Sequence, residues 1–122
     1  MFWHHWFAIG NIFCALGIAL GAFGAHALKG KLSAEHLQIF ETAVRYQMYH
    51  GFALIAVAFA STRVDNTMIK AAGCAFILGI LLFSGSLHML VFANARWAGP
   101  ITPLGGLSFI VGWSLLASAA FC

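Results

Sequence analysis

The sequence predicts an all-α integral membrane protein, a four-helix bundle formed by one domain over residues 1–122, and three observations support this. Hydrophobic residues make up 62% of the chain and charged residues only 7%, which leaves too few polar groups to cover a water-soluble surface. Four apolar stretches, at 7–25, 43–60, 69–91 and 103–121, approach the roughly 20 residues that a spanning helix needs. These stretches lack strand-like alternation, and a helix satisfies its own backbone groups in hydrocarbon.

The few charges indicate which partners the chain has. A net charge of +3 comes from six Lys and Arg residues against three acidic ones, which suits anionic lipid headgroups and gives no nucleic-acid surface. We therefore expect membrane lipids as partners and no nucleic acid. Cys14, Cys74 and Cys122 show no Cys-x-x-Cys spacing, so we expect packed thiols in preference to redox or metal use. For the chain as a whole we expect no metal site and no cofactor.

Small residues recur along the apolar stretches at the spacing that brings helices together. A small residue at every third or fourth position lets another helix backbone approach closely. We expect the chain to self-associate through these faces, as a homo-oligomer or as a subunit of a larger membrane complex. The positions are Gly17, Gly21, Gly24, Ala75, Gly79 and Gly112.

The second apolar stretch is preceded by a helix start. Ser33 is a typical N-cap and Glu35 suits the first turn, so this helix begins well before residue 43, with an interfacial lead-in over 33–42. Residues 45–60 number only 16, so a complete span includes Arg45. That side chain must extend to the interface or pair, and Glu41, four residues earlier, is its expected partner.

Polar residues concentrate in one half of the membrane. The first helix ends where the second begins, and the third ends where the fourth begins, so polar residues near these turns belong to the same half. We expect them to form a buried polar network that fixes the register of the helices. Its predicted members are His26, Glu41, Arg45, Tyr46, Tyr49, His50, Ser84, Ser86, His88 and Thr102.

Four segments carry a resemblance to a known family. They read Gly-Ala-Phe-Gly-Ala-His at 21–26, Phe-Glu-Thr-Ala-Val-Arg-Tyr-Gln-Met-Tyr-His at 40–50, Phe-Ser-Gly-Ser-Leu at 83–87 and Pro-Ile-Thr-Pro-Leu-Gly-Gly at 100–106. In this order they resemble the small membrane proteins of the domain of unknown function 423 family, to which transmembrane protein 256 of animals is similar. The resemblance implies four helices, the inner membrane if the source is a bacterium, and no agreed activity. The chain departs from the family pattern at His88, where relatives tend to carry Tyr.

Three classes of function are open for the polar residues. A structural or accessory membrane component is favoured, because intramembrane ionisable residues usually pair and no spacing here matches a known catalytic site, so we expect no enzyme activity. A small-solute or proton transporter would titrate Glu41 and His50. A haem, metal or quinone site would draw on His26, His50 and His88 from three helices.

Overall fold

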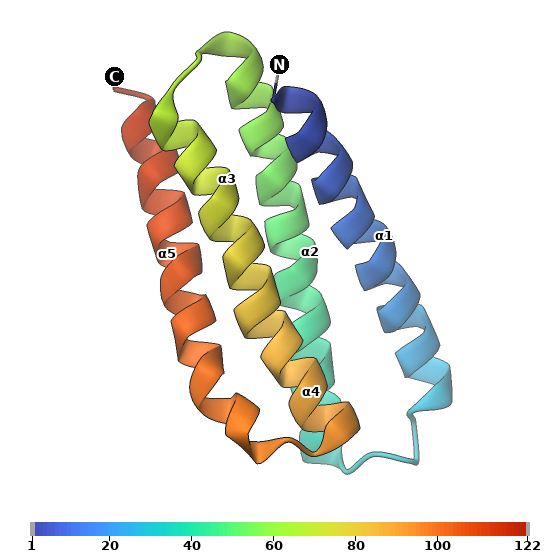
Figure 1. Cartoon of the computed structure of the whole chain (residues 1–122). Helices are drawn as coiled ribbons and strands as arrows, with labels where there is room; N and C mark the ends of the chain where they lie inside the picture. Colours follow the sequence, from blue (N-terminus) through green and yellow to red (C-terminus); the bar gives the residue numbers. More distant parts are fainter. Residues whose placement is uncertain (1, 122) are drawn as a thin grey trace.

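The computed structural model describes residues 2–121, and it confirms the all-α architecture. Four long helical rods stand side by side (Figure 1): α1 (Trp3–Ala27), α2 (Ala34–Arg63), a third rod, and α5 (Thr102–Ala119). The third rod is continuous and consists of α3 (Thr67–Gly79), the π-helical turn η1 (Ile80–Ser84) and α4 (Gly85–Ala93). A 3-10 turn, η2 (Arg96–Ile101), leads directly into α5.

Three of the rods are long and apolar enough to cross a membrane. They cover Trp3–Gly24, Thr67–Ala93 and Arg96–Ala119, which overlap the spans expected at 7–25, 69–91 and 103–121. The span expected at 43–60 lies within α2 and stays a prediction. α2 has 30 residues in one unbroken helix, about 45 Å at 1.5 Å per residue, so the lead-in before residue 43 continues along the axis of the apolar part.

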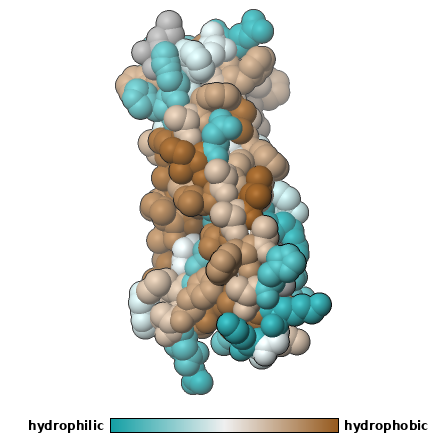
Figure 2. All heavy atoms as spheres, turned by 90° about the vertical axis from the view of Figure 1, so that its right-hand side faces the viewer, coloured by the Kyte–Doolittle hydropathy of each residue, from teal (hydrophilic) through white to brown (hydrophobic). Residues whose placement is uncertain are grey.

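The surface pattern agrees with a membrane environment. On the face where α1 lies, apolar side chains occupy the middle of the molecule and polar ones gather at both ends (Figure 2). Large apolar side chains that stand exposed along α1 include Ile12, Ile18 and Phe23. An apolar belt of this extent is unfavourable in water and is covered by hydrocarbon in a bilayer.

Local signals set the helix ends. The expected N-cap is confirmed, because Ser33 Oγ accepts a hydrogen bond from the backbone N–H of His36 at 3.1 Å. α5 begins at Thr102 with a proline in its first turn, a position where the missing N–H of proline is not needed. Asn66 caps α3 by accepting a backbone hydrogen bond at 2.7 Å, and Asn94, with φ of 49°, ends α4 in the left-handed conformation.

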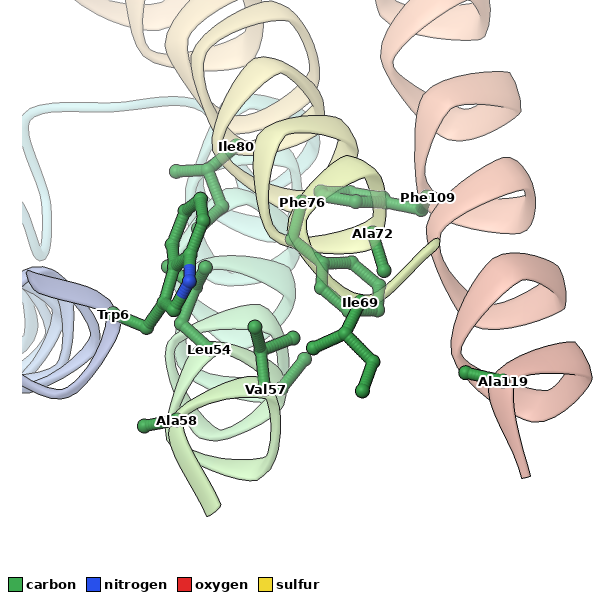
Figure 3. Close-up of a cluster of buried hydrophobic side chains, with 11 residues drawn as sticks. Trp6, Leu54, Val57, Ala58, Ile69, Ala72, Phe76, Ile80, Phe109 and Ala119 are labelled. Carbon is green, nitrogen blue, oxygen red and sulfur yellow. The ribbon is translucent and has the colours of Figure 1, made fainter. Parts of the chain in front are cut away.

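The hydrophobic core lies between α2 and α3, with contributions from the outer helices. Leu54 and Phe76 are fully buried at its centre. Trp6 extends from α1 toward Leu54 and the third rod (Figure 3). Its ring lies against Gly73, where a Cβ would come within 2.7 Å of the indole. Trp6 therefore fastens α1 to the centre of the bundle.

The small residues named above lie at helix contacts within the chain. Those of α1 face side chains of α2, and those of α3 and α5 face each other, so the protein's own helices occupy the faces on which we expected self-association. Ser108 Oγ also donates to Ala75 O at 2.7 Å. The facing pairs are Gly17 with Met48, Gly21 with Val44, Gly24 with Phe40, Gly79 with Phe109 and Gly112 with Phe76.

The cysteines differ in their surroundings. Cys14 is packed as expected, because its Sγ would lie only 2.6 Å from a Cβ at Gly51. The expectation is wrong for Cys74, which is exposed, since it falls on the outward face of α3. Cys122 lies outside the described residues.

Candidate functional site

α2 divides the expected polar network into two parts. Residues four apart on a helix share a face, so Glu41 and Arg45 line a cavity beside α1, whereas Tyr46 and His50 line a groove beside α5. Within residues 2–121 the ten predicted members therefore do not form one network. The two parts have different surroundings.

His50 is buried and engaged at both ring nitrogens. Its Nδ1 lies 2.8 Å from Tyr46 O, and the indole Nε1–H of Trp113 donates to its Nε2 at 3.1 Å. An indole N–H can only donate, so Nε2 is the acceptor, and the ring proton sits on Nδ1 and is donated to Tyr46 O. The imidazole also stacks on Phe109, with centroids 3.5 Å apart and planes 8° apart.

This arrangement fixes the protonation state of the imidazole. A second proton, on Nε2 of His50, would face the N–H of Trp113 and place two donors opposite each other. The hydrogen bond that joins α2 to α5 exists only while the imidazole is neutral.

Three hydroxyl groups fasten the third rod to its neighbours. Ser84 Oγ is buried and donates to Ala43 O of α2 at 2.8 Å. Ser86 Oγ donates to Phe83 O at 2.9 Å and lies 2.6 Å from Thr102 Oγ1 of α5. Because a hydroxyl has one proton, Thr102 is the donor in the second contact. These predicted members of the network do connect different helices.

The contacts of these hydroxyls gather around the π-helical turn η1. Gly105 of α5 lies so close to the backbone of Phe83 that a Cβ on the glycine would overlap the Phe83 nitrogen. On the other side, the ring of Tyr46 packs against that of Phe83 with centroids 4.7 Å apart. The segments 40–50, 83–87 and 100–106 thus meet at η1, and single π turns in helices are frequent at functional sites.

The charged members of the predicted network lie elsewhere. Among residues 2–121, Glu41 and Arg45 do not form the expected ion pair, and the salt bridge in that part of the chain joins Lys70 to Asp65 at 3.1 Å. The side chains of Glu41 and Arg45 are exposed toward the cavity beside α1. An isolated ion pair at an exposed position contributes little to stability. The exposed members of the predicted set include His26, Glu41, Arg45 and Tyr49.

The ring of His88 packs among aromatic side chains. Its ring lies 5.6 Å from Phe40 and 6.1 Å from Phe92, measured between centroids. Both ring nitrogens are buried, without a hydrogen-bond partner in the part of the chain that the structure describes. Within that part, no three His, Cys, Asp or Glu side chains converge as metal ligands. His26, His50 and His88 are therefore not brought together as a site.

Three interhelical hydrogen bonds come from residues outside the predicted network, one of them the bond from Ser108 to Ala75 O. Gln47 Nε2 donates to Phe13 O at 3.0 Å and joins α2 to α1. Trp113 joins α5 to His50, 63 positions away in the chain. A lone amide inside an apolar stretch is a signal for Gln47, whereas the role of Trp113 depends on how α2 and α5 are rotated.

The fold and these contacts define a small helical membrane protein in which buried polar side chains fasten the helices. Comparison with known proteins is consistent with this. The chain belongs to the family described as protein of unknown function DUF423, which matches residues 20–106. This confirms the family resemblance noted in the sequence.

Relatives are similar over nearly the whole length. The chain is 42% identical over 113 residues to the UPF0382 membrane protein YwdK of Bacillus subtilis, covering 92% of each. It is 42% identical to UPF0382 membrane proteins of Staphylococcus haemolyticus, over 93% of this chain and 92% of the relative, and of Haemophilus influenzae, over 93% and 89%. No solved structure matches the chain. The relatives are named membrane proteins, and three helices are long and apolar enough to cross a membrane, so the membrane location expected for this protein is confirmed.

Proposed function

We propose that the protein is a structural or accessory membrane component without enzyme activity, which self-associates or joins a larger membrane complex. The observation that supports this most directly is the engagement of both ring nitrogens of His50, with Nδ1 bonded to Tyr46 O within α2 and Nε2 bonded to Trp113 of α5. A proton carrier needs a side chain that gains and loses a proton, and here protonation breaks the contact with Trp113. A metal or haem ligand needs a free ring lone pair, and Nε2 of His50 uses its lone pair as an acceptor.

The first prediction concerns activity. Proteoliposomes of the purified full-length protein should dissipate a proton gradient no faster than empty liposomes, because His50 stays neutral. A pH-sensitive dye measures the gradient, and an added ionophore shows that the vesicles are sealed. The protein solution should show no visible absorbance band and no stoichiometric metal.

Two outcomes would contradict this proposal. A flux abolished by Glu41→Gln and unaffected by Glu35→Gln, an exposed acid on the same helix, would identify a transporter. An absorbance band or a bound metal that is lost in His50→Phe would identify a cofactor site. Loss in His50→Phe counts only if the variant keeps its helical circular dichroism.

The outer face of α1 supports the proposal of self-association. Asn11 is exposed on this face, and its amide donates to Phe7 O at 2.7 Å, while its Oδ1 has no hydrogen-bond partner among residues 2–121. An acceptor left open toward lipid is unfavourable, and a helix of a second copy would supply a donor. The exposed alanines on the same face allow close approach: Ala8, Ala15, Ala19 and Ala22.

The second prediction tests that face. Ala15→Leu should weaken self-association by about tenfold, because a larger side chain separates the helices and removes contacts worth about 1–2 kcal/mol. Single-molecule photobleaching in bilayers, over a range of protein-to-lipid ratios, measures the oligomer population. Ala117→Leu, on the exposed face of α5, is the matched control. A monomeric wild type, or an unchanged population in both Ala15→Leu and Asn11→Leu, would rule out this interface.

A further inference from the structure

A cavity opens between α1 and α2 near the turn that joins them, and none of the interhelical hydrogen bonds described above lies in it. Its volume is about 510 Å³, within the usual range for small-molecule sites. Figure 1 shows α1 and α2 diverging toward this turn. The wall is apolar and includes Gly21, Gly24 and Phe40, and the rim carries Lys29, Glu41 and Arg45.

The three rim charges are free to meet a ligand. Lys29, Glu41 and Arg45 are exposed, and within residues 2–121 none of them forms an ion pair within 4 Å. Two cations and one carboxylate therefore surround a single opening. This is a combination of charges that favours a ligand with both a negative and a positive group.

The depth of the cavity points to a lipid. Gly24 packs against Phe40 of α2, and the first charged residue after α1 is Lys29, five positions further on, so this level lies near the edge of the hydrocarbon. Glu41 lies at that edge and Arg45 about 6 Å deeper, one helical turn further, from where its guanidinium can extend back to phosphate level. The apolar wall continues inward past Gly21, so an occupant needs a polar head and an apolar chain.

We propose that this cavity is a binding site for a glycerophospholipid with a primary ammonium headgroup, of the phosphatidylethanolamine class. Arg45 and Lys29 bind the phosphate, Glu41 accepts hydrogen bonds from the ammonium group, and one acyl chain lies along the wall at Gly21 and Gly24. Phosphatidylglycerol has no ammonium group from which Glu41 could accept a charge-assisted hydrogen bond. Phosphatidylcholine has no N–H to donate to Glu41. This site goes beyond the structural role proposed above and does not depend on it.

The test is native mass spectrometry of the full-length protein in mixed micelles. The micelles contain equal amounts of phosphatidylethanolamine, phosphatidylglycerol and phosphatidylcholine with the same acyl chains. The wild type should retain phosphatidylethanolamine preferentially, and Arg45→Gln should lower its retention about tenfold, as expected for loss of a charge-assisted hydrogen bond. Glu41→Gln should shift the preference to phosphatidylglycerol. Arg96→Gln is the matched control, since Arg96 is an exposed cation in the other turn at the same end of the bundle.

The reversal in Glu41→Gln distinguishes a specific site from general attraction of lipid to a basic protein. Equal retention of the three lipids by the wild type, or the same loss in Arg96→Gln as in Arg45→Gln, would overturn the proposal. Displacement of the lipid by millimolar inorganic phosphate would also overturn it, because it would indicate a site for free phosphate. If Arg45→Gln does not fold, the lipid preference of Glu41→Gln decides alone.

Discussion

Gly105→Ala should lower the free energy of unfolding by about 1–3 kcal/mol, the range for inserting volume into a packed interface. A Cβ at this position would overlap the backbone nitrogen of Phe83 and lie 2.7 Å from its Cβ. Backbone atoms of η1 cannot rotate away as a side chain can, so α5 must move off the third rod. Unfolding by sodium dodecyl sulfate in mixed micelles, followed by circular dichroism, measures the change.

The neighbouring glycine supplies a control with the same chemistry. A Cβ at Gly106 would have its nearest neighbour, an atom of the Phe83 ring, at 3.9 Å, which is an ordinary contact. Alanine favours a helix over glycine by about 1 kcal/mol, so Gly106→Ala should leave stability unchanged or raise it. Equal stability of the two variants would show that α5 does not pack against η1 as described.

The fold was predictable because it follows from composition and local signals. An apolar stretch long enough to span the bilayer forms a helix, because a helix satisfies the hydrogen bonds of its own backbone in hydrocarbon. The N-cap of α2 is equally local, because Ser33 accepts a hydrogen bond from the backbone N–H of His36, three residues away. The turn after the first helix and the turn after the third helix lie at the same end of the bundle, which also predicted that Ser84, Ser86 and Thr102 share one half of it. Their hydroxyls do join neighbouring helices.

The candidate site was predictable only in part, because its arrangement depends on rotation about the helix axes. Glu41 and Arg45 turn toward α1, and Tyr46 and His50 turn toward α5, a division that residue spacing alone leaves open. The π-helical turn η1 has no local sequence signal of its own. It occurs where Gly105 permits close contact with Phe83 and where Ser84 reaches Ala43 O. The partner of His50 likewise comes from a helix distant in sequence.

Trp113→Phe should destabilise the protein by about 1–3 kcal/mol, the range for leaving a buried hydrogen-bonding group without its partner. Phenylalanine keeps an aromatic ring that can lie near Phe76, whose centroid is 4.8 Å from that of Trp113, and removes the N–H that Nε2 of His50 accepts. Trp97→Phe is the matched control, because Trp97 is 65% exposed in η2. The same unfolding assay measures both variants.

A second replacement separates the hydrogen bond from the packing. His50→Phe in the Trp113→Phe background removes both partners, which is nearly neutral when shapes are kept, so the double variant should be more stable than the sum of the single changes implies. Nitrogen NMR of labelled histidine should place the proton of His50 on Nδ1 in the wild type, since Nε2 is the acceptor. Strictly additive effects, or a proton on Nε2, would contradict the assigned hydrogen bond. Loss of that bond would return His50 to the groups able to carry a proton through the bundle.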